Sequence, residues 1–265
     1  MNLFTFRLAK LEKCLMKNLK DTKIAFPIET QLIESGLALM WNLNHVTQEA
    51  IKDFGIKPNL YTNTNLFGRN RHLLLNGYFS MLCANYGTHF VISRTVLENN
   101  NLMRLFNKNP QLVFRWLPKR QSKKFPSEIR EKYNEYYKSK RTTKSKDEFS
   151  PSWVIKNVFS TIDKKDVKKQ LSRIYGQLCN YTHPNFLGWQ ELMGMQGKTE
   201  ILLDLPTLVG ANADEAIRMT LYLTQLSLKT FVETFRDYLN KHLFETFELN
   251  EWQENCMKIM VKYVV

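Results

Sequence analysis

A long apolar region from about Arg69 to Asn107 constrains the fold of this chain more than any other feature of its sequence. Apolar residues with helical spacing over such a length need other apolar faces to cover them, so we expect this region to be the spine of a helix bundle. The chain is 43% hydrophobic and has only ten glycines and eight prolines, which is typical of a folded, helix-rich protein. The sequence therefore predicts an all-α fold, a multi-helix bundle with at most one short strand.

Further helices are expected on both sides of the spine. Apolar spacing predicts a helix over residues 3–20, and Pro27 suits the first turn of a second helix that runs to about Phe54. Residues 55–68 have the Gly, Pro, Asn and Thr content of a loop. The remaining predicted helices span residues 127–138, 151–159, 163–181, 212–242 and 250–262, and residues 199–205 are the candidate strand.

Small residues and histidines on the spine have their own interpretations. Gly77 and Gly87 indicate either close helix contacts or a break in the spine helix. His72 and His89 lie on this apolar spine helix, so we expect each to be a core or boundary residue rather than a ligand. The five tryptophans lack the regular clustering of a base-stacking platform, which favours roles as core or staple residues for most of them.

The cysteines and the N-terminus indicate the compartment. Four scattered cysteines in apolar helical contexts suggest neither a disulfide framework nor a zinc site. The first twenty residues alternate apolar and basic side chains and lack the apolar core of a signal peptide. No stretch of about 18 apolar residues could span a bilayer. We therefore expect a soluble, cytoplasmic, single-domain protein over residues 1–265, with no metal and no cofactor.

Positive charge is concentrated in one segment. The formal net charge is +13, and residues 115–146 hold twelve Lys or Arg against three Glu. Such a block attracts polyanions through phosphate contacts and counterion release, but a solvated loop has the same composition. We interpret residues 119–150 as a basic, mobile insertion, because it has too little apolar area to order itself. The candidate substrate-binding cations in it are Lys119, Arg120, Lys123, Lys124, Lys140 and Arg141.

Two polar motifs interrupt otherwise apolar helices. Arg94 and Glu98 are four residues apart on the spine, so their side chains face the same direction. The stretch Tyr175-Gly-Gln-Leu-Cys-Asn180-Tyr-Thr-His183-Pro184 ends another predicted helix and adds a histidine, an asparagine and two tyrosines. We expect these two helices to pack side by side and to form a polar site, with Tyr175 and Asn180 as substrate-binding residues.

The two motifs together resemble uncharacterised bacterial helical proteins that look related to the HEPN superfamily, over roughly residues 65–240. That superfamily includes metal-independent ribonucleases of toxin and defence systems. Their signature is an arginine, usually followed by Asn, Asp or His, with four to six residues in all between the arginine and a catalytic histidine. His183 lacks this signature, because the nearest preceding arginine, Arg173, is too far away. It occurs once elsewhere, as Arg236-Asp-Tyr-Leu-Asn-Lys-His242.

The resemblance implies a chemistry for these residues. RNA cleavage without a metal needs a group of near-neutral pKa to move the 2′-hydroxyl proton and a fixed cation to stabilise the phosphorane. His183 with Arg94 and Glu98, or His242 with Arg236, would be the catalytic residues. Structural interpretations stay open for both sets. Arg94 and Glu98 can be an ion pair that fixes helix packing, with His183 hydrogen-bonded to that pair. The stretch from Arg236 to His242 can be a solvated helix end.

The leading hypothesis is thus a HEPN-like protein that binds RNA or another nucleotide-bearing polyanion and acts as a metal-independent endoribonuclease of a defence or toxin system. The alternative is a non-catalytic helical interaction module that docks nucleic acid or an acidic protein partner. The aromatic segment 185–189 is a candidate contact surface for a homodimer or larger assembly.

Overall fold

The computed structural model describes residues 3–54, 57–117, 125–139, 148–158, 165–182, 210–236 and 249–261. Within these ranges 91% of the residues are helical and none lies in a strand, which confirms the predicted all-α multi-helix fold. The candidate strand at 199–205 lies outside the described residues. The helices are α1 (Leu3–Ala25), α2 (Pro27–Phe54), α3 (Pro58–Leu82), α4 (Tyr86–Lys108), α5 (Leu112–Trp116), α6 (Ser127–Ser139), α7 (Pro151–Val158), α8 (Lys165–Thr182), α10 (Gly210–Phe235) and α12 (Leu249–Val261).

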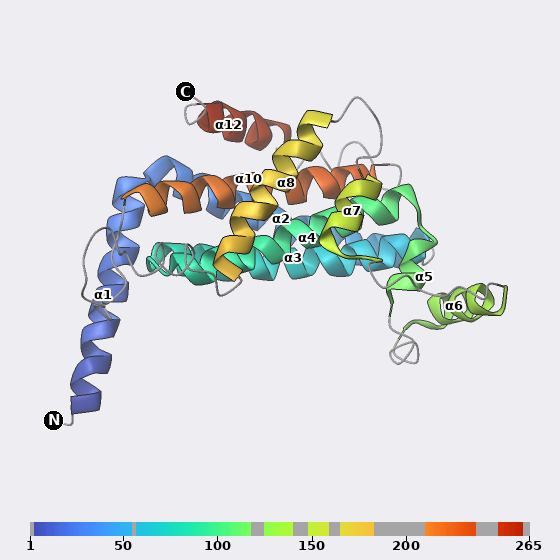
Figure 1. Cartoon of the computed structure of the whole chain (residues 1–265), viewed down its shortest axis with the longest axis horizontal. Helices are drawn as coiled ribbons and strands as arrows, with labels where there is room; N and C mark the ends of the chain where they lie inside the picture. The colour runs from blue at the N-terminus through green and yellow to red at the C-terminus, as the bar shows by residue number, and fades with distance from the viewer. Residues whose placement is uncertain are drawn as a thin grey trace.

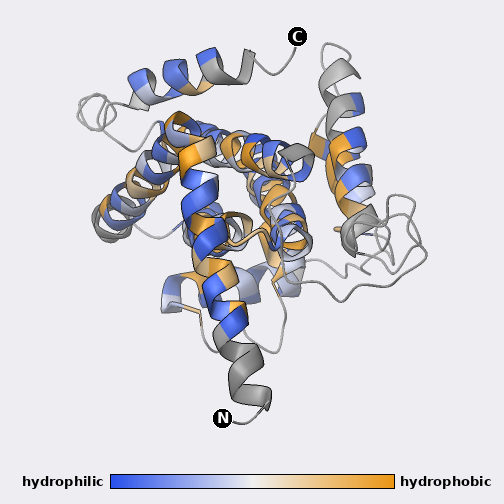
Figure 2. Cartoon of the chain, turned by 90° about the vertical axis from the view of Figure 1, so that its left-hand side faces the viewer, coloured by the Kyte–Doolittle hydropathy of each residue, from blue (hydrophilic) through white to orange (hydrophobic). Residues whose placement is uncertain are grey.

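An antiparallel hairpin of α3 and α4 forms the centre of the molecule (Figure 1). Helices α2 and α10 pack on this hairpin, α7 and α8 pack on α4, and α12 packs on α2 and α10. Helix α1 projects from one end of the bundle, and α6 lies at the opposite end (Figure 1). Apolar residues gather toward the middle of the bundle and hydrophilic residues on its outside, as amphipathic helices require (Figure 2).

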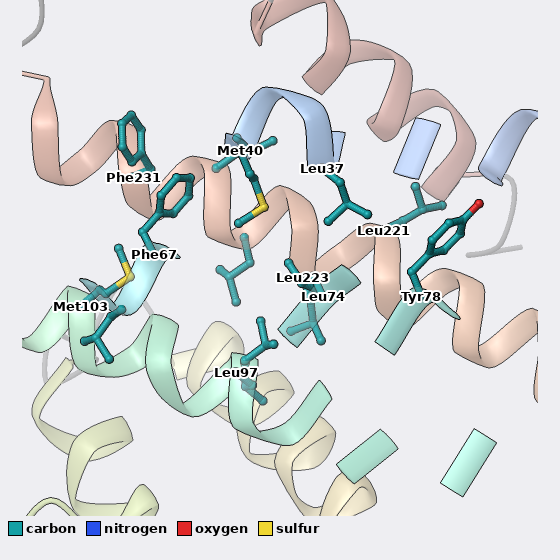
Figure 3. Packing of buried hydrophobic residues seen from close by; sticks show 14 of the residues in the cluster. Leu37, Met40, Phe67, Leu74, Tyr78, Leu97, Met103, Leu221, Leu223 and Phe231 are labelled. Carbon is teal, nitrogen blue, oxygen red and sulfur yellow. The ribbon is translucent and has the colours of Figure 1, made fainter. Parts of the chain in front are cut away.

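Large apolar side chains from four helices meet in the core (Figure 3). Phe67 of α3 and Phe231 of α10 lie with ring centroids 4.5 Å apart. Met40 of α2 and Leu97 of α4 are fully buried in the same cluster. The long apolar region predicted as the spine therefore supplies two adjacent helices of the core rather than one.

The prediction of a loop over residues 55–68 is wrong from Pro58 onward, where α3 begins. Three of the Asn and Thr residues of this stretch, Thr62, Asn63 and Thr64, are buried, whereas Asn65 is exposed. Asn63 donates to the Oδ1 of Asn107 at 2.8 Å, and Asn107 donates to the Oγ1 of Thr234 at 2.8 Å. Buried polar side chains with such partners are compatible with a packed helix, so the loop-like composition was misleading.

The spine breaks at residues 83–85, between the two glycines that suggested an interruption. Ala84 takes a left-handed backbone conformation with φ 59°, and the side chain of Asn85 caps α4 by accepting from the backbone N–H of Thr88. Gly77 marks a close contact instead: a Cβ there would lie 3.3 Å from Ile92. Both interpretations of the spine glycines thus have a counterpart, a break near Gly87 and a contact at Gly77.

Part of the basic insertion is ordered by aromatic packing. Helix α6 coincides with the predicted 127–138 helix and buries Tyr133 and Tyr136, whose rings contact Phe114 of α5. Arg115 donates to the buried carboxylate of Glu148 at 2.6 Å, which ties the two ends of the segment together. Residues 118–124 and 140–147 lie outside the described residues. The mobility of the insertion as a whole stays a prediction.

The C-terminal helices match the predicted ones with shifted ends. Helix α10 begins at Gly210, so Asn212 lies within its first turn and is not its N-cap. It is described to Phe235, with Arg236 in a turn beyond it, and the predicted continuation to His242 lies outside the described residues. Helix α12 agrees closely with the predicted 250–262 helix.

Candidate functional site

Arg94, Glu98 and Tyr175 form a closed ring of three hydrogen bonds where α4 packs against α8. The Nε of Arg94 donates to the Oε1 of Glu98 at 3.0 Å, and its Nη2 donates to the phenol oxygen of Tyr175 at 2.7 Å. The Tyr175 hydroxyl donates in turn to the Oε1 of Glu98 at 3.0 Å. The predicted packing of these two helices is therefore confirmed, and the spacing-based pairing of Arg94 with Glu98 is observed directly.

The ring is half-buried, and its surroundings shift the pKa of Arg94 and of Tyr175. Burial by itself lowers the pKa of Arg94, but the hydrogen bond to Glu98 and nearby negative charge outweigh it and raise that pKa. Burial and then the charge of Glu98 raise the pKa of Tyr175 above its ordinary range. At neutral pH the ring thus holds a permanent guanidinium cation and a protonated phenol.

Helix α8 supplies Tyr175 because its inward face is apolar around this position. Ile174 and Leu178 pack into the core beside Tyr175, and Leu178 is 1% exposed. Cys179, one turn after Tyr175, is close enough to influence the pKa of both Arg94 and Tyr175. A polar ring at the edge of an apolar helix contact is thereby held in one geometry, since its helices cannot shift without uncovering the core.

The other predicted site residues are not placed with the ring. His183 follows Thr182, the last residue of α8, and lies outside the described residues, as does His242. Asn180 is part of α8, but its side chain is not described. Arg236 is exposed in the turn after α10. The six cations of the insertion also lie outside the described residues: Lys119, Arg120, Lys123, Lys124, Lys140 and Arg141.

His89 is a core residue, as predicted for this position. It is 2% exposed, and its Nδ1 lies 3.0 Å from the carbonyl oxygen of Gly77. A carbonyl only accepts, so Nδ1 carries the proton, and Nε2 accepts from the Ser93 hydroxyl at 3.3 Å. Both ring nitrogens therefore have partners inside the protein.

Sequence reasoning missed a second polar group, in a groove between α2 and α3. His72, expected at a core or boundary position, is exposed there, and Trp41 is 59% exposed rather than part of the core. Arg71 stacks on the Trp41 ring, with its guanidinium carbon 3.9 Å from the ring centroid. The run Arg69-Asn-Arg71-His72 was the available signal, but its partner residues on α2 are distant in sequence.

Metal-binding clusters and membrane-spanning helices are absent from the described part of the chain. No group of three or more His, Cys, Asp or Glu side chains among these residues is arranged to hold a metal ion. None of the described helices combines the length and hydropathy that crossing a bilayer requires.

Comparisons with known protein families, with curated proteins and with solved structures found no match to this chain. Its function must therefore be inferred from its own residues.

Proposed function

We propose that this chain is a HEPN-like, cytoplasmic protein that binds RNA or another nucleotide-bearing polyanion and cleaves RNA without a metal, in a defence or toxin system. The observation that supports it is the Arg94–Glu98–Tyr175 ring. This ring fixes the Arg94 cation against α8, the helix that precedes His183 in the sequence. Fixed charge beside a titratable histidine is the minimum that metal-independent transesterification of RNA requires.

Each residue of the site has a distinct role in this proposal. His183 moves the proton of the 2′-hydroxyl, since imidazole is the side chain with a near-neutral ordinary pKa. Arg94 stabilises negative charge on the phosphorane. Glu98 and Tyr175 are positioning residues, because their hydrogen bonds fix the guanidinium in one orientation. Asn180 and the basic insertion contact the bound strand.

The test is incubation of purified protein with total RNA in the presence of a chelator. Cleavage by the wild type and its loss in Arg94→Gln and His183→Ala are expected. Arg218→Gln is the matched control, because Arg218 also pairs with a carboxylate in its own helix, Asp214, but lies on α10. Loss in His242→Ala alone would move the chemistry to Arg236 and His242. Absence of cleavage by the wild type under all conditions would overturn the enzymatic part of the proposal.

A second function has one observation in its favour. The three side chains of the ring satisfy one another, as expected of a network that fixes helix packing. In that case the chain is a non-catalytic helical module that docks nucleic acid or an acidic protein partner, alone or as a homodimer or larger assembly.

Tyr175→Phe separates the two functions. It removes one donor and one acceptor from a half-buried network, which costs about 1–2 kcal/mol of unfolding free energy in either case. If Arg94 is catalytic, the variant also lowers kcat for RNA cleavage. In that case kcat stays low even when a stabilising osmolyte restores the thermal midpoint of the variant. A stability loss without any change in cleavage or binding favours the structural role.

A further inference from the structure

The groove between α2 and α3 has the composition of an anion site. Its volume is about 420 Å³. It is lined by Trp41, Asn44, His45, Thr64, Asn65, Gly68, Arg69, Arg71 and His72. Two arginines and two histidines thus face one concave surface, and none of these lining residues is an aspartate or glutamate.

Neither arginine of the groove has a carboxylate partner among the described residues, in contrast to four arginines elsewhere in the bundle. Arg94, Arg104 and Arg115 each have a glutamate oxygen within 3.4 Å, and Arg218 is paired with Asp214. No such contact joins Arg69 or Arg71 to an acid among the described residues. Their charges are therefore not neutralised within this part of the protein, and an anionic ligand would supply the missing counter-charge.

Arg71 is held in place before any ligand arrives. Its guanidinium stacks on Trp41 at 3.9 Å, and its Nη2 donates to the Nε2 of His72 at 2.8 Å. A guanidinium fixed on a ring loses less freedom when it binds a phosphate than a mobile one does. The geometry of the stack therefore favours a ligand with phosphate oxygens.

The same stack offers an aromatic surface beside the cations. Trp41 remains 59% exposed although Arg71 covers part of its ring. Gly68 lets α3 approach α2 closely at the groove, because a Cβ there would lie 3.1 Å from the Oδ1 of the buried Asn44. Exposed aromatic rings next to arginines are how many proteins stack the bases of single strands.

We propose that this groove binds a nucleotide unit, with its phosphate at Arg69 and Arg71 and its base on Trp41. The shared chemistry is that of a nucleoside phosphate, which single-stranded RNA or a free mononucleotide could supply. This inference rests on the proposed nucleic-acid or nucleotide binding and assigns part of it to a surface away from the Arg94 ring. The groove is a binding surface in this proposal and takes no part in bond cleavage.

The test measures fluorescence polarisation of a labelled oligouridylate of about ten nucleotides, a length within the usual range of single-strand sites. Trp41→Leu is expected to weaken binding by about 5- to 150-fold, the effect of removing one stacking ring. The double variant Arg69→Gln/Arg71→Gln is expected to flatten the log-log salt dependence by about 1.4, since each phosphate of a single strand that is neutralised contributes about 0.7. Lys17→Gln/Lys20→Gln on α1 is the control, because it removes the same charge from another exposed surface.

Competition by uridine monophosphate identifies the source of the phosphate. Displacement of the oligonucleotide by the monophosphate at comparable concentration assigns the groove to free nucleotides, and its failure assigns it to RNA strands. Unchanged affinity and salt slope in folded groove variants would overturn this inference while leaving the proposed RNA binding intact. A wild type that binds neither probe overturns both, and circular dichroism of each variant shows that it is folded.

Discussion

At the scale of single residues, His89 is the clearest case in which burial sets a property of the protein. Burial lowers its pKa from 6.5 to about 4, and interactions with the backbone of Gly77 and Ala216 only partly oppose this. A histidine that must stay neutral in the folded state but protonates in the unfolded state couples folding to pH. The neutral tautomer seen in its contacts is the form that this pKa maintains.

We expect the protein to lose stability as the pH falls from about 6.5 to 4. The folded-state pKa of His89 is depressed, so its contribution is complete above the unfolded-state value and disappears below it. At about 1.4 kcal/mol per pH unit, the loss attributable to this residue is about 3 kcal/mol. Urea unfolding at a series of pH values measures it.

Acidic groups also titrate in this pH range, so the contribution of His89 must be isolated by comparing the wild type with a variant at this position. His89→Gln keeps a donor for the Gly77 carbonyl but cannot be protonated, and its unfolding free energy should depend less steeply on pH below 6.5. Parallel curves for wild type and variant would contradict the assignment, whatever their difference in absolute stability.

The residues of the candidate site show what spacing can and cannot predict. The i, i+4 rule was sufficient to pair Arg94 with Glu98, because both belong to one helix. The contact with Tyr175 required a packing argument between two helices, which their apolar faces supplied. The Trp41 and Arg71 stack could not be predicted, since nothing in the sequence specifies the register between α2 and α3.

At the scale of helices, the sequence predicted those helix ends that depend on local residue preferences. Pro27 opens α2 and the helix continues to Phe54, as predicted from proline preference and apolar spacing. The start of α3 was missed because its composition is that of a loop, whereas Asn63 finds its partner Asn107 only once α3 has packed against α4. Tertiary contacts thus overrode composition over residues 58–68.

The docking of α12 depends on the absence of a side chain at Gly36. The Nε1 of Trp252 donates to the carbonyl of Leu32 at 2.9 Å and to the Oγ of Ser35 at 3.1 Å, which places the indole against α2. A Cβ on Gly36 would lie 2.5 Å from the Trp252 ring and 2.8 Å from Thr224. Gly36→Ala should therefore cost about 1–3 kcal/mol by overpacking and displace α12, measured by thermal unfolding and by hydrogen exchange of residues 249–261.

Gly176→Ala is the matched control for this substitution. Gly176 is exposed within α8, and a Cβ there would meet nothing within 4 Å. Alanine restricts the unfolded chain and favours helix, so this variant should gain about 0.5–1 kcal/mol. Equal changes in unfolding free energy for the two substitutions would show that the contact with Trp252 does not exclude a larger residue at position 36.

At the scale of the whole molecule, the net charge of +13 is unevenly distributed along the chain. The segment 115–146 carries a large share of it, while the groove between α2 and α3 holds its own cationic surface in a separate part of the sequence. Long-range attraction of a polyanion depends on the sum of these charges, but the salt slope depends only on those that contact phosphates. Measurements of slope can therefore assign the phosphate-binding cations to one segment or the other.

Replacing Lys119, Arg120, Lys123, Lys124, Lys140 and Arg141 with serine should weaken RNA binding by a similar factor for all sequences. It should also flatten the log-log salt dependence by roughly one unit for each cation that touches a phosphate in the wild type. Cleavage of saturating RNA should persist, because the proposed chemical groups, Arg94 and His183, lie outside this segment of the sequence. If one strand spans both surfaces, the slope changes of this variant and of Arg69→Gln/Arg71→Gln should add in the combined protein. An unchanged slope in the serine variant would show that the insertion does not touch the phosphates, and it would leave the groove as the surface that holds the strand.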